Sequence, residues 1–415
     1  PRSLAAALAW SSAPAALAIA VAAPAHAQVS NASLRGTVKA DGGATEVKAI
    51  NVNTGLTRTS GVSANGSYTF ASLPAGTYRL EITTPGGVRN TDEFILSVAQ
   101  SAVLDFDFSQ PDIAEGGDDA IIVTGSRIRS MEGGEVGTNI SQRLIEVLPQ
   151  NNRNFLAFAD LAPGVQFLTN GSDQSRLQGG AQGSNSVNIF IDGIGQKDYV
   201  LKNGVTGQDS TQGNPFPQLA IGEYRVISSN YKAEFDQVSS VAVTAVTKSG
   251  TNEFHGEGFI DFTNQSLRDR RPAENFPRYI PKVRSKDLQF GGALGGPIIK
   301  DVLHFFVTYE GKRRVNPRDI TPGLELPVSY FPSEYQDVFG SAKETFNENL
   351  YFGKINFTPT PNDLFEFSVK YRDESGEQFN SGFAAFETRT IAKVEEWRGL
   401  ARWEHTADTW VNDFK

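Results

Sequence analysis

The sequence contains no cysteine and a single methionine among its 415 residues. Without cysteine the chain can form neither disulfides nor cysteine-type zinc sites, and it offers no thiol nucleophile. Basic residues are also in deficit, because 38 Lys and Arg stand against 47 Asp and Glu, a formal net charge of −9. This balance argues against a nucleic-acid partner, which would select a concentrated basic face.

Long apolar runs are scarce as well. Beyond the first residues, no window offers the ~18 to 20 consecutive apolar residues of a spanning helix, so any membrane crossing must use strands. The one apolar run follows Arg2 and ends at Ala25-His26-Ala27, which is typical of a secretory signal, residues 1–27, cleaved after Ala27. A membrane-anchoring helix is the alternative, but polar or helix-breaking residues interrupt it: Ser11, Ser12, Pro14 and Pro24.

The residue types of catalytic and metal chemistry are sparse or badly spaced. Glu395 and Glu396 are adjacent, so on a strand they point to opposite faces and cannot act together as acid and base. Neither a nucleophile elbow nor a phosphate-binding loop is present. We expect no enzymatic activity, no cofactor and no metal site, since the four histidines lack ligand spacing: His26, His255, His304 and His405.

Residues 28–109 consist of short runs rich in Val, Thr, Ile, Tyr and Phe, separated by Asp-Gly-Gly, Asn-Gly and Pro-Ala-Gly. Closely spaced antiparallel strands show this turn chemistry, so the pattern predicts a β-sandwich. Tyr68 and Phe70 should share one face of a strand, and Tyr78, Leu80 and Ile82 one face of another.

Residues 110–130 have the composition of a linker that contains one strand-forming segment without a local partner. The segment is either a stray edge strand of a neighbouring domain or a peptide offered to the sheet edge of another protein. It comprises Ile121, Ile122, Val123, Thr124 and Gly125.

Residues 131–250 mix helical and strand patterns, which predicts a compact α+β domain. Apolar residues at helical spacing within 141–162 indicate two short helices. The run Val241–Thr247 contains only small or β-branched residues, as a strand buried on both faces would. Four residues of the expected loops face either solvent or a ligand: Arg153, Lys197, Asp198 and Lys202.

Residues 251–415 contain seven or eight segments of alternating polarity, about the ~9 to 11 residues of a transmembrane β-strand. In the segment 365–371, for example, Phe, Phe, Val and Tyr occupy one face and Glu, Ser and Lys the other. A soluble β-sandwich would show the same alternation, so periodicity alone leaves both architectures open.

Taken together, these segments resemble the TonB-dependent outer membrane receptors, and among them the Oar-like branch with an N-terminal carboxypeptidase-regulatory-like domain. The ordered motifs that carry the resemblance are SANGSYTFASLPAGTYRLEI, IIVTGSRI, RNFLAFADLAPGV, NIFIDGI, YKAEFDQVSSVAVTAVTKSGTNEFHGEGF and GGALGGPIIKDVLHFFVTYEG. One departure is Ser239-Ser240, where family members typically have a glycine pair.

The resemblance implies a mostly β fold: an N-terminal β-sandwich, an α+β plug domain and the first strands of an incomplete antiparallel transmembrane β-barrel. A plugged transporter barrel has about 22 strands, so we expect an N-terminal part of a longer protein. The segment Ile121–Gly125 would be the TonB box, Asp192 and Gly193 a plug motif, and Ser249, Gly250, Thr251 and Asn252 the junction between plug and barrel.

The function implied is energised uptake of a large or scarce ligand in the outer membrane, with the N-terminal domain and TonB box in the periplasm. The expected partners are the periplasmic domain of TonB, outer membrane lipid, the barrel-assembly machinery and an unknown extracellular ligand, such as a siderophore, cobalamin, an oligosaccharide or a peptide. A secreted or surface-attached adhesion or glycan-binding protein without transport activity is the competing hypothesis.

Overall fold

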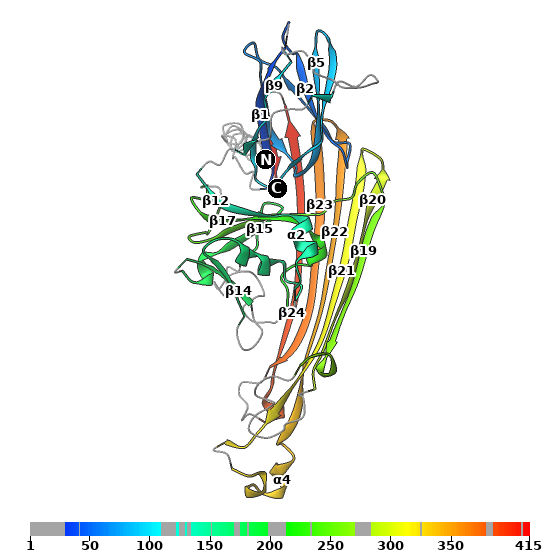
Figure 1. Ribbon diagram of the computed structural model, residues 1–415. Helices are drawn as coiled ribbons and strands as arrows, with labels where there is room; N and C mark the ends of the chain where they lie inside the picture. Colours follow the sequence, from blue (N-terminus) through cyan, green and yellow to red (C-terminus); the bar gives the residue numbers. More distant parts are fainter. Residues whose placement is uncertain are drawn as a thin grey trace, which may run out of the picture.

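The computed structural model describes residues 30–40, 42–108, 122–123, 129–130, 134–150, 152–169, 175–180, 182–197, 213–232, 235–269, 284–323, 326–378, 385–407 and 410–415. The expected signal sequence, Ile121, Thr124, Gly125, Asp198 and Lys202 lie outside these ranges. Within them, no helix is long and apolar enough to cross a membrane. Figure 1 shows a long sheet that runs beside two smaller bodies, the N-terminal domain at one end of the sheet and an α+β domain along it.

The N-terminal domain is a sandwich of two sheets. One contains β1 (Ala32–Lys39), β4 (Ser67–Leu73), β8 (Ser101–Val103) and β9 (Phe106–Asp107), and the other β2 (Glu46–Asn51), β3 (Thr57–Gly61), β5 (Gly76–Thr84), β6 (Gly87–Thr91) and β7 (Phe94–Leu96). Alternate residues of β1 and β5 are buried, so the apolar faces of the two sheets form one core. The residues expected to share inward faces all lie in this core: Tyr68, Phe70, Tyr78, Leu80 and Ile82.

The expected linker contributes a short strand to each sheet of the sandwich. β10 (Ile122–Val123) pairs in parallel with β6, and β11 (Arg129–Ser130) pairs antiparallel with β8. The segment at Ile122 therefore has a partner within the chain, which is the edge-strand alternative that the sequence left open. A two-residue pairing leaves no periodic signal, because hydrogen bonds between main chains can form with almost any side chains.

The second domain, called the plug below, contains a five-stranded sheet in the order β12-β17-β18-β15-β16. Its central strand β18 (Ala242–Thr247) is buried over almost its whole length, as the run of small and β-branched residues predicts. One helix is as expected, α2 (Gln142–Val147), whereas the second is the 3₁₀ helix η1 (Phe155–Leu161). The other elements are β12 (Val136–Ile140), β13 (Val165–Thr169), β14 (Ser175–Gly179), η2 (Ser184–Ser186), β15 (Asn188–Ile191), β16 (Ile194–Gly195), η3 (Gln218–Ala220) and β17 (Ile221–Ser229).

The third unit, called the wall, is an antiparallel meander of seven strands within the described residues: β19 (His255–Asn264), β20 (Lys286–Ile299), β21 (Leu303–Ile320), β22 (Gly340–Thr360), β23 (Asp363–Gln378), β24 (Thr390–Thr406) and β25 (Val411–Phe414). Short helical turns lie in its connections: η4 (Gln265–Leu267), η6 (Val328–Tyr330), α4 (Ser333–Gln336) and η7 (Phe386–Thr388). Side chains that face the plug are mostly polar or charged, with apolar exceptions such as Phe306 and Phe352, whereas the opposite face exposes apolar and aromatic residues.

Several wall strands are much longer than the expected ~9 to 11 residues. β21 has 18 residues and β22 has 21, and they remain paired up to Ile320 and Gly340. The polar composition of residues 312–341 suggests a loop, but residues 312–320 and 340–341 belong to the two strands, and residues 321–339 connect them. The alternation of polarity marks only the part of a strand that faces an apolar solvent, so the sequence pattern stops before the pairing does.

Candidate functional site between the plug and the wall

Several backbone groups of the plug are hydrogen-bonded to side chains of the wall. The amides of Asn214 and Leu219 each donate a 2.5 Å hydrogen bond, to the carboxylates of Glu348 and Glu310 respectively. The ammonium of Lys370 donates to the carbonyl oxygen of Pro215 at 3.0 Å. This plug segment is irregular and lacks sheet partners, and buried backbone groups need hydrogen-bond partners. The wall side chains provide them.

The plug backbone lies close to two carboxylate side chains of the wall at Gly213. A Cβ atom at Gly213 would lie within 2.4 Å of carboxylate atoms of both Glu348 and Glu374, so any other residue there would displace these carboxylates. Beside it, Phe216 packs on Phe352 of the wall with ring centroids 5.2 Å apart. The interface thus has an apolar part, in which Phe306 and Phe352 of the wall join the hydrophobic core of the plug.

Asp192 and Gly193 form the two-residue turn between β15 and β16. Both have positive φ, 50° and 82°, the geometry that an Asp-Gly hairpin turn requires. The carboxylate of Asp192 then accepts hydrogen bonds from the amide and hydroxyl of Thr247, at 2.9 and 2.7 Å. The predicted plug motif is thus joined to the last residue of the buried strand β18.

The same carboxylate reaches the wall through Lys354. The ammonium of Lys354 lies 3.7 Å from Asp192, 3.0 Å from Glu366 and 3.2 Å from the hydroxyl of Thr247. Lys354 is 6% exposed and Asp192 also 6%, so neither charge can be solvated by bulk water. Each group depends on the others, because an unpaired buried charge is costly.

The ion network continues along the wall into the N-terminal domain. Arg402 bridges Glu366 and Glu404 at 2.6 and 2.7 Å, and Glu404 lies 3.3 Å from Arg58 of β3. Asn31 and Ser72 also donate to Glu404, at 2.6 and 3.0 Å. Arg58 is 1% exposed and Glu404 is fully buried, so the sandwich is docked on the wall by a desolvated ion pair.

The predicted junction, Ser249 to Asn252, is where the plug chain enters the wall. A Cβ at Gly250 would lie 2.3 Å from the carbonyl oxygen of Phe305, so only glycine can occupy this position beside the wall backbone. The side chain of Asn252 exchanges hydrogen bonds with Asp301, at 2.7 and 2.8 Å, and lies 2.9 Å from the ring of His304. The amide of Asn252 donates to the carbonyl oxygen of Asn53, so the junction also contacts the sandwich.

A second contact joins the sandwich directly to the plug strand β17. The amide of Val98 donates to the carboxylate of Glu223, and Arg225 donates to the carbonyl oxygen of Ala99 at 3.1 Å. Burial raises the pKa of Glu223 to about 7, and the hydrogen bond from Val98 only partly offsets this effect. The contact therefore includes a carboxyl group that changes its charge near neutral pH.

Of the loop residues considered as ligand contacts, the described ones, Arg153 and Lys197, are partly exposed and have partners within the chain. The guanidinium of Arg153 stacks 3.6 Å above the ring of Phe259, and Lys197 donates to the carbonyl oxygens of Asn185 and Gln237. Among the described residues no group of three or more His, Asp or Glu is placed to hold a metal ion.

The sequence did not predict which wall residues pair with the plug and the sandwich. Glu366, Arg402 and Glu404 do lie on the polar face of predicted strands, but the alternation of polarity does not show which charged groups pair with one another. Arg58 gave no signal, because a single arginine in a sandwich strand is ordinarily solvated.

Two family models match parts of the chain. Residues 33–109 match a carboxypeptidase regulatory-like domain, and residues 246–327 match an outer membrane beta barrel domain. The TonB-dependent transporter Oar of Myxococcus xanthus is 28% identical over 185 residues, which cover 42% of this chain and 16% of that protein. The chain is homologous to the TonB-dependent outer membrane transporters of the Oar type.

A solved structure shows the same fold. The outer membrane transporter YddB of Escherichia coli superposes with a TM-score of 0.51 at 14% identity, over 66% of this chain and 37% of that one. The ferric enterobactin receptor PfeA of Pseudomonas aeruginosa gives 0.45 at 16% identity, over 66% and 39%. The chain therefore spans less than half the length of these relatives.

This Oar homologue is an outer membrane protein, and its exposed apolar wall face is the lipid-facing surface. The mostly β fold, with a sandwich, a plug and the first strands of a transmembrane sheet, is as predicted. Its relatives are transporters and receptors rather than enzymes, in agreement with the expectation of no catalytic activity.

Substitution of Lys354 by methionine should loosen the plug. Loss of the ammonium leaves Asp192 and Glu366 buried without their cation, and breaking a buried pair costs about 3–5 kcal/mol. Hydrogen exchange of the β18 amides should accelerate accordingly. Lys300→Met, in an exposed turn, should leave this exchange unchanged; equal protection in both variants would contradict the role of Lys354.

Gly250→Val should prevent the chain from closing its junction, because the added Cβ would overlap backbone atoms of both Phe305 and Gly296. We expect a several-fold loss of folded protein, measured as the heat-modifiable band on unboiled gels. Gly61→Val is the matched control, since a Cβ at Gly61 meets no atom within 4 Å. Normal folding of the Gly250 variant would show that the close approach is not required.

The docking of the sandwich on the plug should weaken as the pH rises towards neutrality. The pKa of Glu223 is raised from 4.5 to about 7 in the folded protein, so the docked state favours the protonated carboxyl. Its stabilising contribution is complete below pH 4.5 and is lost as the pH rises through about 7. Glu223→Gln should remove this dependence from thermal unfolding curves recorded between pH 4.5 and 8, and parallel curves for both proteins would refute it.

Proposed function

We propose that this Oar homologue takes up a large or scarce ligand by energised displacement of the plug. The observation that carries the proposal is the plug–wall interface, in which backbone amides and carbonyls of residues 213–219 pair with charged side chains of the wall. Water can replace such polar contacts one by one, whereas a dry apolar interface would resist separation. The candidate ligand classes are those proposed from the sequence: a siderophore, cobalamin, an oligosaccharide or a peptide.

The segment Ile121–Gly125 is our candidate TonB box. Its described residues, Ile122 and Val123, are paired in parallel with Asn90 and Thr91 of β6. Such pairing supports the idea that the segment forms a strand, which is how a peptide joins the sheet edge of a partner. TonB would have to replace β6 as the pairing strand before it could pull on the chain leading to the plug.

The sandwich is proposed to be a periplasmic module that stabilises the closed state. It contacts the wall through Arg58, the junction through Asn53 and the plug through Val98. A pull between the sandwich and the plug would act on all three contacts. Homology to an outer membrane transporter favours this function over a secreted adhesion protein.

Coupling to TonB can be tested by disulfide capture, since residues 1–415 contain no cysteine and any cysteine elsewhere in the receptor can be replaced. A cysteine at Ile122 in the complete receptor should cross-link in vivo to a cysteine in the periplasmic domain of TonB, because the two main chains would lie side by side. A cysteine at Thr57, in β3 of the sandwich, is the control and should give no adduct. Ile122→Pro should also abolish coupling, because proline removes a main-chain donor.

Absence of capture at position 122, in a receptor that is correctly inserted, would remove the energised-transport proposal. Equal capture at positions 122 and 57 would indicate unspecific proximity and would equally argue against a TonB box at this segment.

A further inference from the structure

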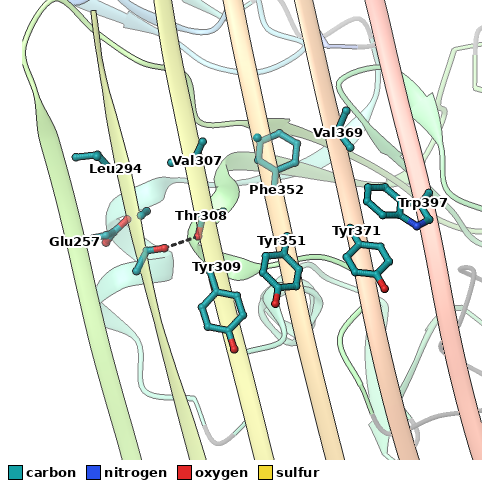
Figure 2. A pocket seen from close by; sticks show the side chains of 13 residues that line it. Glu257, Leu294, Val307, Thr308, Tyr309, Tyr351, Phe352, Val369, Tyr371 and Trp397 are labelled. Carbon is teal, nitrogen blue, oxygen red and sulfur yellow. Dashed lines mark hydrogen bonds between the residues drawn. The ribbon is translucent and has the colours of Figure 1, made fainter.

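The lipid-facing side of the wall contains a groove across β20, β21, β22 and β23, shown in Figure 2. Its volume is about 750 Å³, within the range of about 300 to 1,000 Å³ of ligand pockets. Gly292 and Gly353 form its floor, because they lack side chains where their neighbours carry large ones. Apolar and aromatic residues border it: Leu294, Val307, Val369, Tyr309, Tyr351 and Tyr371.

One border of the groove is a continuous aromatic row. Tyr309, Tyr351, Tyr371 and Trp397 are directly opposite one another on successive strands, with neighbouring ring centroids 4.9, 5.8 and 4.1 Å apart. The hydroxyls of Tyr309 and Tyr371 donate to Asn349 and Glu395, both on the side away from the groove. Tyrosines with this arrangement mark the boundary between hydrocarbon and headgroups.

A second aromatic row fixes the opposite boundary. Phe357, Phe365 and Trp403 follow one another across β22, β23 and β24, with ring centroids 6.1 and 6.0 Å apart. Six residues separate Tyr351 from Phe357, about 20 Å along a strand at ~3.3 Å per residue. The groove lies directly beside the tyrosine row, so it occupies one half of the hydrocarbon layer.

The connections between strands identify that half as the outer one. The strands at the phenylalanine end are joined by the short turns 300–302 and 361–362, whereas residues 321–339 join β21 to β22 at the other end. Outer membrane barrels have short turns on the periplasmic side and long loops outside. The tyrosine row therefore lies at the outer surface, and the groove opens into the outer leaflet.

Two cations lie on the same face, farther out along the strands than the tyrosine row. Arg313 is four residues outward of Tyr309 and opposite Leu288, and Lys286 is two residues outward of Leu288 on β20, so the two side chains are diagonal neighbours. At ~3.3 Å per residue, Arg313 is about 13 Å beyond the row. The guanidinium of Arg313 is held by carbonyl and amide oxygens of Lys312, Glu348 and Asn349. Arginine and lysine at headgroup depth are suited to a phosphate.

We propose that the groove binds an acyl chain of a phosphorylated outer-leaflet lipid, whose phosphate lies between Arg313 and Lys286. The apolar groove, the aromatic boundary and the cations follow one another along the strands in the order of acyl chain, interface and headgroup. A protein partner would not need that order. The lipid would stabilise β20 to β22, the strands whose inner faces hold the plug.

The groove can be filled by one substitution that does not strain the sheet. A Cβ at Gly353 would have a single neighbour within 4 Å, Val307 at 3.8 Å, so Gly353→Leu should fold and place its side chain in the groove. Gly399 lies in the same cross-strand row and its Cβ would meet only Ser368, at 3.9 Å, but it does not border the groove. Gly399→Leu is therefore the matched control.

The receptor and both variants would be extracted from outer membranes in a mild non-ionic detergent, and bound lipid would be counted by native mass spectrometry. We expect one phosphorylated outer-leaflet lipid on the wild type and on Gly399→Leu, and at least a tenfold lower occupancy on Gly353→Leu. The double variant Arg313→Gln with Lys286→Gln should retain the fold and also lose the lipid.

Equal lipid occupancy in all four proteins would overturn the proposal, as would a bound lipid of the inner leaflet. If Gly353→Leu fails to fold, the double variant decides, because its changes are confined to the lipid-facing surface. The measurement does not depend on transport, so its outcome is independent of whether TonB drives this receptor.

Discussion

The structure depends on one constraint: charged groups buried between the plug, the wall and the sandwich must be paired, because bulk water does not reach them. Lys354 stands at the centre of this pairing, between Asp192 of the plug and Glu366 of the wall. Arg402 and Glu404 extend the chain of charges to Arg58 of the sandwich. Since each member compensates a neighbour, the three units share one closed arrangement, and moving one of them leaves charges of the others unpaired.

This arrangement gives the sandwich a mechanical position as well as a structural one. It is linked to the wall at Glu404 and to plug strand β17 at Glu223. The segment at Ile122 pairs with strand β6 of the sandwich. Force applied at that segment would reach the sandwich edge before it reached the plug, so release of the sandwich would come first.

The sequence was sufficient wherever a pattern repeats or a turn demands a residue type. The burial of Val241–Thr247 followed from its β-branched residues, the alternation in 365–371 predicted a strand with two different faces, and both are confirmed. Asp192 and Gly193 occupy a turn that requires positive φ. The sequence was insufficient for contacts between units: the partner of Arg58 is 346 residues away, and the pairing of Ile122 with β6 involves only two residues.

The wall shows why one set of strands can serve two environments. Because successive side chains point to opposite faces, Phe352 packs on the plug while Gly353 opens towards lipid, and Lys370 bonds to plug backbone while Tyr371 stands at the membrane boundary. The inward-facing residue of each pair contacts the plug, and the outward-facing one lies on the lipid-facing surface. A change that shifts a strand by one residue would exchange both sets at once, so the register of the wall is fixed from both sides.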